Sequence, residues 1–271
     1  LYAINAESGK LSWEKQWPVN GLPALIEGLV ASDGIVYAGT GKGLCAIETK
    51  DGKVLWQNKD WGQGEGTTTT FSVTGDKLIG SSQWNALYGN DLKTGALKWT
   101  ANTNGLRNRG ASAAVHGNLL YLISDKSFFI LEANTGRVVV RKELPFSVDV
   151  TSTPLLTDKE IIFGSAKDGL VALDNETLEL KWKFATGDAL VFTSPYSRKP
   201  AATIETSPVL AGNTVYVGAS DGTIYGVNKE DGKLVWKHAT GAPVFGSVTV
   251  SGNALIAVDF GGNVYTFVAG N

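Results

Sequence analysis

The chain has 271 residues, of which 43% are hydrophobic and 18% charged, and its formal net charge is −2. This composition excludes a disordered chain, and the balanced charge excludes a general attraction to nucleic acid or to anionic lipid. No run of 18 apolar residues is present, so no transmembrane helix is expected. The 33 glycines exceed the usual share of roughly 7%, as many tight turns between short strands would require.

The first residues indicate a piece of a longer protein. The chain has no methionine, and Leu1 already lies in the middle of a repeat. No signal peptide precedes it. We therefore expect residues 1–271 to be one domain of a longer chain.

An eleven-residue phrase recurs along the sequence and is the main evidence for the fold. It occupies residues 3–13, 46–56, 89–99, 130–140, 172–182 and 226–236. Four of the five spacings between successive copies are 41 to 43 residues, and the fifth is 54. A fixed period of this length is typical of a tandem repeat architecture.

Each phrase has the pattern of a strand, a turn and a second strand. Pairs such as Asp51-Gly52 and Asp231-Gly232 supply the positive φ of a tight hairpin, and apolar and polar residues alternate after them. Further strands are expected upstream, in the sixth repeat at 204–210, 214–219 and 223–227. Four strands per repeat without a helical period predict an all-β propeller of four-stranded antiparallel blades.

The number of blades depends on the two partial repeats. Residues 1–16 supply two outer strands, residues 243–268 supply three inner strands (247–250, 254–259 and 264–268), and five complete blades lie between them. We therefore expect about seven blades. Eight would follow if another repeat preceded Leu1.

The phrase A-x-[DN]-x-x-[ST]-G-x-x-x-W resembles the tryptophan-docking motif of PQQ-like (quinoprotein-type) β-propellers, a family that includes quinoprotein alcohol dehydrogenases and BamB-like outer-membrane assembly factors. The resemblance covers essentially the whole chain. It implies that tryptophan and glycine lock neighbouring blades together, and it assigns the structural docking role to Trp13, Trp56, Trp99, Trp182 and Trp236. Val140 replaces a tryptophan and Leu178 replaces a glycine, which we expect to loosen two junctions.

The resemblance also raises the alternative of a PQQ-dependent oxidoreductase, which the cysteine content argues against. In that family an adjacent-cysteine disulfide typically packs on the cofactor, whereas this chain has only Cys45, which we interpret as a small core residue on a third strand. His116 and His238 have no partner at metal-ligand or nucleophile–base spacing, and both are expected to be solvated. We therefore expect no catalytic residue, no metal and no cofactor.

Aligning the innermost strands places one residue of each blade in a ring around the central channel. The ring positions are Glu27, Thr68, Gly110, Thr151, Glu205 and Phe245, with Arg107, Arg109 and Asp149 nearby. A mixed-charge ring of this kind could hold a small polar ligand or an ion, or it could be a water-filled channel that tolerates any polar side chain.

The loops at one end of the blades collect aromatic and charged residues. They are Trp61, Gln63, Glu65, Trp84, Asn85, Arg107, Arg109, Phe260 and an insertion at 185–203 that contains Tyr196 and Arg198. Aromatic residues and arginine on loops are typical of recognition surfaces, although Trp61 and Trp84 could instead cover blade cores. The predicted ligand- or partner-binding residues are Glu27, Arg109, Glu205, Trp61, Trp84, Tyr196, Arg198 and Phe245.

These observations favour a non-catalytic module that acts as a protein-interaction scaffold or binds a small polar ligand. The expected partners are other protein domains or that ligand, without nucleic acid. Any catalytic domain would lie outside these residues. The family resemblance implies an extracytoplasmic location, periplasmic or at the cell surface.

Overall fold

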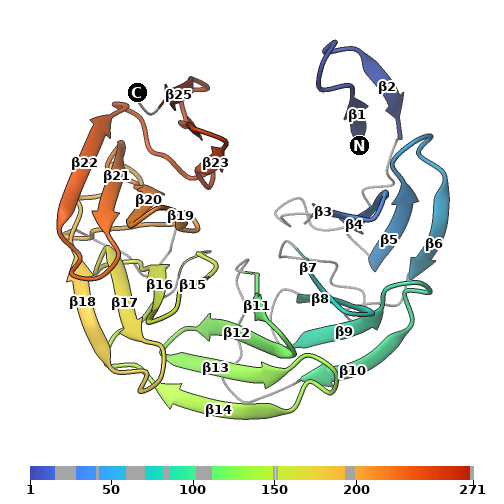
Figure 1. Ribbon diagram of the computed structural model, residues 1–271, viewed down its shortest axis with the longest axis horizontal. Helices are drawn as coiled ribbons and strands as arrows, with labels where there is room; N and C mark the ends of the chain where they lie inside the picture. Colours follow the sequence, from blue (N-terminus) through green and yellow to red (C-terminus); the bar gives the residue numbers. More distant parts are fainter. Residues whose placement is uncertain are drawn as a thin grey trace. The chain divides into compact units, whose positions relative to one another are not determined.

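The computed structural model describes residues 1–15, 29–40, 43–58, 71–81, 86–101, 112–148, 150, 152–192 and 199–268. All regular elements of these residues are β-strands, which form seven sheets (Figure 1). The all-β propeller prediction is confirmed.

The strand bounds follow the repeat. The first sheet has two strands, β1 (Tyr2–Ile4) and β2 (Leu11–Glu14). The five four-stranded sheets are β3 (Leu29–Ser32), β4 (Ile35–Thr40), β5 (Gly43–Glu48) and β6 (Val54–Asn58); β7 (Ser72–Thr74), β8 (Lys77–Ser81), β9 (Leu87–Asp91) and β10 (Leu97–Ala101); β11 (Ala114–His116), β12 (Leu119–Ser124), β13 (Ser127–Glu132) and β14 (Val138–Glu143); β15 (Leu155–Leu156), β16 (Glu160–Gly164), β17 (Leu170–Asp174) and β18 (Leu180–Phe184); β19 (Val209–Ala211), β20 (Thr214–Gly218), β21 (Thr223–Asn228) and β22 (Leu234–Ala239). The last sheet has three strands, β23 (Thr249–Ser251), β24 (Ala254–Val258) and β25 (Val264–Val268).

Strands that follow one another in sequence are neighbours in each sheet, as in a propeller blade. In the sixth blade β20 and β21 pair antiparallel from Thr214↔Asn228 to Gly218↔Ile224. The predicted innermost strand at 204–210 is wrong in its bounds, because only Val209–Ala211 is a strand. The preceding residues bond elsewhere: Ile204 N donates to Ser165 O at 3.0 Å, and Ser207 N donates to Ser247 Oγ at 2.9 Å.

Glycine and tryptophan meet between successive blades as the motif predicts. A Cβ built on Gly232 would lie 2.8 Å from the Trp182 ring, so only glycine lets the indole lie flat on the turn. The φ of Gly232 is +71°, which glycine also tolerates best. Trp13, Trp56 and Trp99 contact a glycine in the same way, at Gly52, Gly95 and Gly136.

Each of these indoles also donates a hydrogen bond to the turn that it covers. Nε1 of Trp182 donates to Lys229 O at 3.0 Å, three residues before the docking glycine. The corresponding distances are 2.7 Å for Trp13 to Thr49 O, 3.2 Å for Trp56 to Leu92 O and 2.9 Å for Trp99 to Ala133 O. The docking contact is therefore a repeated unit of apolar packing and one hydrogen bond.

Leu178 keeps the turn of the glycine that it replaces. Its φ is +58°, and its N donates to Asp174 O at 2.9 Å, as Gly232 N donates to Asn228 O at 3.0 Å. The buried leucine therefore adopts a left-handed conformation that is costly for a side chain with a Cβ. The loosening of two junctions stays a prediction.

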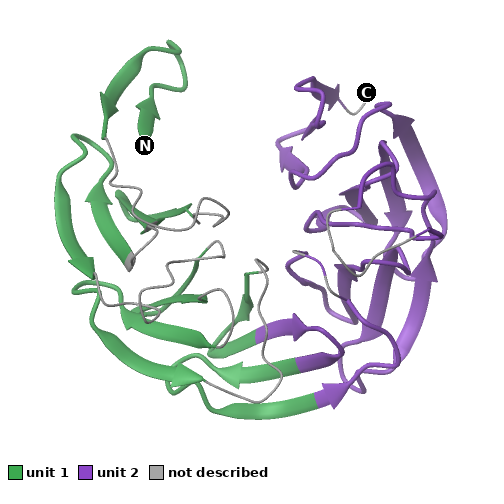
Figure 2. Cartoon of the chain, turned by 180° about the vertical axis from the view of Figure 1, so that it is seen from behind, with its two compact units in different colours: residues 1–120, 129–141 green, residues 121–128, 142–271 purple. Residues whose placement is uncertain are grey.

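The chain divides into two compact units, Leu1–Leu120 with Phe129–Arg141 and Tyr121–Phe128 with Lys142–Asn271 (Figure 2). In unit 1 a core of Tyr37, Leu44 and Ala46 packs with Leu78 and Tyr88. In unit 2 Trp182 and Ile162 pack with Val215, Val217 and Val227. Both cores lie between neighbouring sheets, and the single domain spanning 1–271 stays a prediction.

Candidate functional site

The loops at one end of the blades in unit 2 are joined by backbone hydrogen bonds into a continuous surface. We call it the loop face and define it as residues 165–169, 185–192, 199–203, 219–222, 240–246 and 259–263. The turns between second and third strands lie here beside the segments that enter the innermost strands.

The insertion is fixed to both neighbouring blades. Gly169 N donates to Ala202 O at 2.7 Å, and Leu190 N donates to Ser220 O at 2.9 Å. Further along, Val244 N donates to Ala219 O at 3.1 Å. The first two bonds attach the insertion to the β16–β17 turn on one side and to the β20–β21 turn on the other, and the third joins that turn to the segment before β23.

The two ends of the insertion meet in a narrow neck. Ala189 N donates to Ala201 O at 2.9 Å, and Ala201 N donates to Asp188 Oδ1 at 3.0 Å. The two ends of the insertion are therefore side by side at Ala189 and Ala201. Its described residues, 185–192 and 199–203, belong to no strand.

Carboxylates stabilise the turns of this face. Asp221 Oδ2 accepts from Gly187 N at 2.8 Å and from the Tyr225 hydroxyl at 2.6 Å. Burial, together with this carboxylate, raises the pKa of Tyr225 to about 12. The hydrogen bonds from Asn263 hold the pKa of Asp259 below its ordinary value. Asp259 is thus held within its own turn, whereas Asp221 joins its turn to Gly187 through Oδ2, and its buried Oδ1 has no partner among the described residues.

Apolar side chains, in contrast, project from the loop face into solvent. Leu190 is 55% exposed and Val191 43%, and both belong to the insertion. Phe260 is 71% exposed and packs edge to face on half-buried Phe245, with ring centroids 5.3 Å apart. Phe260 N donates to Pro243 O at 2.7 Å, which fixes the position of this aromatic pair on the face.

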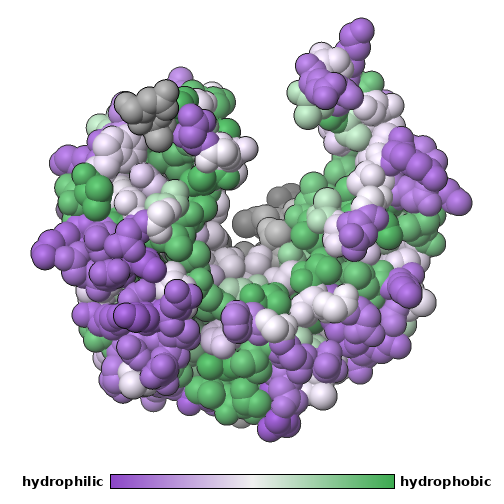
Figure 3. Space-filling view, viewed as in Figure 1, coloured by the Kyte–Doolittle hydropathy of each residue, from purple (hydrophilic) through white to green (hydrophobic). Residues whose placement is uncertain are grey.

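Exposed apolar residues also occur elsewhere on the molecule. The space-filling view shows hydrophobic surface in patches among hydrophilic surface (Figure 3). On the outer strands residues such as Leu97, Leu234 and Val235 are also exposed, which is normal for a protein surface. The loop face differs because its exposed residues come from loops that hydrogen bonds hold together.

The predicted binding residues fall into two groups. Glu205 and Phe245 are described: Glu205 is only 8% exposed, and Phe245 forms the pair with Phe260. Glu27, Arg109, Trp61, Trp84, Tyr196 and Arg198 lie outside the described residues, as do Thr68, Gly110, Thr151, Arg107, Asp149, Gln63, Glu65 and Asn85. The sequence did not single out Leu190 and Val191, although they lie inside the insertion that it identified.

The histidines and the cysteine have structural environments. Cys45 is fully buried on β5, as predicted, and burial raises the pKa of its thiol to about 12. His116 is exposed, as predicted, whereas His238 is half-buried and so only partly solvated. His238 lies on the same side of β22 as Trp236 and stacks on it, with Phe267 at 4.9 Å between ring centroids.

No group of three or more metal-ligating side chains occurs in the part of the chain that the structure describes. Among the same residues no helix is long and apolar enough to cross a membrane. The geometry of the loop face suits the burial of apolar surface against another molecule.

Comparison with known proteins identifies relatives over the whole chain. The family model described as outer membrane protein assembly factor BamB matches residues 1–113, 91–204 and 191–271. The outer membrane protein assembly factor BamB of Escherichia coli is 28% identical over 97% of this chain and 78% of its own length. These relatives are named as an assembly factor and not as an enzyme, which confirms the prediction of a non-enzymatic propeller. Their name agrees with the expected extracytoplasmic location.

Solved structures support the fold. BamB from Moraxella catarrhalis superimposes with a TM-score of 0.64 at 18% identity, covering 99% of this chain and 96% of that chain. A europium-containing methanol dehydrogenase gives a TM-score of 0.69 at 14% identity, covering 99% of this chain and 74% of that chain. Because an enzyme and an assembly factor share these blades, the likeness shows the architecture alone. The chain belongs to the PQQ-like β-propeller family whose model is described as outer membrane protein assembly factor BamB.

Proposed function

We propose that this chain is a protein-interaction scaffold in outer-membrane protein assembly and that the loop face of unit 2 is the surface that contacts its partner. One observation supports the choice of this surface: Leu190, Val191 and Phe260 are exposed on loops that backbone hydrogen bonds link to one another. The assembly role is suggested by the name of the relatives.

Two physical arguments support an interaction surface here. Exposed apolar side chains cost free energy in water and lose that cost when a partner covers them. The hydrogen bonds of the neck and of Leu190 N hold the loops in place, so less conformational entropy is lost on binding. The insertion is also the one large departure from the repeat period, and insertions in repeat proteins often lie on the binding face.

A replacement of the insertion tests this proposal. Residues 190–200 are exchanged for Asn-Gly, which spans the neck because Ala189 N and Ala201 O are already hydrogen bonded. The strands on either side keep their pairing, so the variant is expected to fold. In cells that produce the protein, the variant replaces the natural gene, and the abundance of folded outer-membrane proteins is measured.

Point variants separate the surface from the fold. Leu190→Ser and Phe260→Ser together are expected to reduce the level of folded outer-membrane proteins, as the replacement does. The matched control is Leu234→Ser, since Leu234 is similarly exposed, at 47%, but lies on the outer strand β22. Equal function of the double variant and the control would place the contact surface elsewhere, on the outer strands or on the opposite face.

A further inference from the structure

The two halves of the insertion are attached to different blades. The second half is bonded to the β16–β17 turn, where the Thr203 hydroxyl donates to Ala166 O at 2.7 Å. The first half is bonded to the β20–β21 turn, where Leu190 N donates to Ser220 O at 2.9 Å. The exposed Leu190 and Val191 belong to the first half. Their position therefore depends on how this half is held to the sixth blade.

One side chain of the sixth blade also holds the first half. Asp221 Oδ2 accepts from Gly187 N at 2.8 Å. A Cβ built on Gly187 would lie 3.0 Å from this oxygen, so the glycine gives the carboxylate room to approach the backbone. Among the described residues no other side chain of the β20–β21 turn bonds the insertion, because Ser220 Oγ has no partner there. Asp221 is therefore the side-chain link between this turn and the insertion.

The carboxylate of Asp221 is itself held from inside the blade. The Tyr225 hydroxyl donates to Asp221 Oδ2 at 2.6 Å. Burial, together with this carboxylate, raises the pKa of Tyr225 to about 12, so the hydroxyl remains a donor at neutral pH. The Tyr225 ring packs edge to face on Phe184, with centroids 5.2 Å apart, and Phe184 ends β18 just before the insertion. We call the four residues Phe184, Tyr225, Asp221 and Gly187 the clasp, since they hold the start of the insertion at two points.

The last sheet contains the same tyrosine without a clasp. Tyr265 has the register position on β25 that Tyr225 has on β21. Its hydroxyl donates to Asp259 Oδ2 at 2.9 Å, and Asp259 Oδ1 accepts from Asn263 N at 2.9 Å within one turn. A tyrosine–carboxylate pair can therefore stabilise a turn without holding the preceding segment. The bond from Gly187 to the carboxylate is what distinguishes the clasp.

We propose that Asp221 is a positioning residue of the loop face, which holds the insertion through Gly187 so that Leu190 and Val191 are presented to the partner. The inference rests on the proposed function and adds the side chain that keeps this surface in place. A surface that is already fixed loses less conformational entropy when a partner covers it. Without the clasp, the start of the insertion loses its side-chain link to the sixth blade, and binding has to order it.

The first measurement follows the insertion in the purified 271-residue chain. Val191→Cys introduces one accessible thiol, since the natural Cys45 is fully buried, and a nitroxide label on it reports mobility by electron paramagnetic resonance. Asp221→Ala is expected to make the label more mobile. It should also speed hydrogen exchange at the Gly187 amide by about tenfold, as the loss of one hydrogen bond predicts. Asp221→Asn keeps an acceptor oxygen for Gly187 N and is expected to leave both signals unchanged.

Asp174→Ala is the matched control for this measurement. Asp174 Oδ1 accepts from Thr177 N at 2.9 Å and from the Thr177 hydroxyl at 3.0 Å. This carboxylate thus stabilises a turn as well, but at the end of β17 opposite to the loop face. The label at position 191 is expected to keep its mobility in Asp174→Ala. The control separates release of the insertion from a general loss of stability.

The second measurement is the abundance of folded outer-membrane proteins in cells that carry each variant in place of the natural gene. Asp221→Ala is expected to lower this abundance, as Leu190→Ser with Phe260→Ser does. Asp221→Asn is expected to restore it. A residue that served only the stability of the fold would not give this pattern, because the mobile label and the lower abundance would then not occur together.

Four results would overturn the proposal. The first is a label that stays immobile in Asp221→Ala, and the second is a label that is equally mobile in Asp221→Asn. The third is an unchanged abundance in Asp221→Ala while Leu190→Ser with Phe260→Ser lowers it, which would leave the proposed function standing. The fourth is an unchanged abundance in both, which would reject the proposed function and the positioning role with it.

Discussion

The indole of Trp182 lies on the turn at Gly232, so close that a Cβ at that position would lie 2.8 Å from the ring. Gly232→Ala therefore adds two costs, the left-handed conformation at φ +71° and the overlap with the indole. We expect about 1–2 kcal/mol from the first and a further ~1–3 kcal/mol from the second. Urea unfolding measures the sum.

Gly212→Ala is the matched control for this change. Its φ is +58°, but an added Cβ would have nothing within 4 Å. Only the conformational cost of about 1–2 kcal/mol is expected. If Gly232→Ala and Gly212→Ala lowered the free energy of unfolding equally, the contact with the indole would contribute nothing. Glycine would then be required at position 232 by its φ alone.

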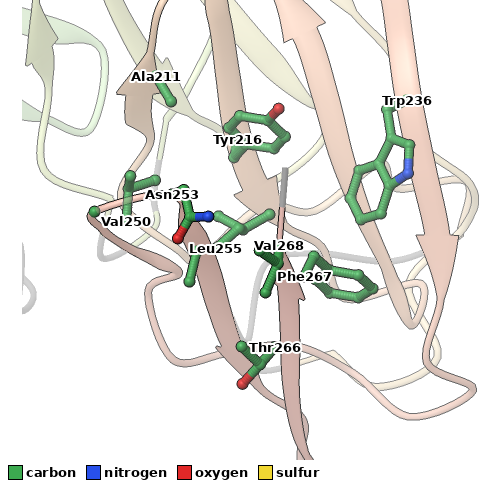
Figure 4. A pocket seen from close by; sticks show the side chains of 11 residues that line it. Ala211, Tyr216, Trp236, Val250, Asn253, Leu255, Thr266, Phe267 and Val268 are labelled. Atoms are coloured by element: carbon green, nitrogen blue, oxygen red, sulfur yellow. The ribbon is translucent and has the colours of Figure 1, made fainter. Parts of the chain in front are cut away.

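Trp182 and Trp236 differ in what surrounds them, and their removal is expected to differ in cost. Trp182 is 9% exposed and packs on both Gly232 and the core of unit 2. Trp182→Ala should cost roughly 3–5 kcal/mol, as expected for a buried aromatic residue. Trp236 borders a pocket of about 660 Å³ (Figure 4), so Trp236→Ala should cost clearly less. Thermal melting of the two variants distinguishes them, and equal losses would contradict this account.

The repeat period predicted the sheets because each phrase combines a glycine turn with an alternating strand. The innermost strand was harder to predict, since residues such as Ile204 and Ser207 have a strand-like pattern but bond to neighbouring blades. The environment of His238 depends on which side of β22 faces the next sheet, which composition does not reveal. Leu178 shows that a turn can keep its geometry without the glycine that signals it.

The candidate site was predictable only in outline. The 54-residue spacing marked the insertion, but the exposure of Leu190 depends on the neck at Ala189 and Ala201, which no local pattern indicates. Phe245 was selected for its ring position, and its packing with Phe260 depends on the loop between β24 and β25. Long-range hydrogen bonds, and not residue types, decide which loop residues form one surface.

Glu160 provides a test of pH dependence. Burial opposes its ionisation, but the hydrogen bonds from Lys181 Nζ at 2.6 Å and Thr157 Oγ1 at 2.7 Å outweigh burial and hold its pKa below the ordinary value. A carboxyl group with a lowered folded-state pKa stabilises the protein above its unfolded pKa of about 4.3, and this contribution is lost as pH falls through the folded value.

Glu160→Gln is therefore expected to reduce the free energy of unfolding at pH 7 by about 1–3 kcal/mol. The difference from the unaltered protein should shrink as the pH falls below about 4, because the unaltered carboxyl group is then protonated as well. Unfolding curves measured between pH 3 and pH 7 show this convergence. A difference that stayed constant over the range would mean that the charge of Glu160 does not contribute.

Asn90 is a polar residue at a core position of the repeat, and its replacement is expected to stabilise the protein. Ile47, Leu131, Leu173 and Val227 occupy the same position in other repeats. Asn90 is fully buried, its Oδ1 has no partner among the described residues, and its Nδ2 reaches Leu78 O only at 3.5 Å. An unpaired buried amide oxygen costs about 1–3 kcal/mol, so Asn90→Leu should raise the melting temperature. Asn90→Asp, which buries a charge at the same place, should lower it, and a loss of stability in both variants would show that the amide of Asn90 is satisfied in solution.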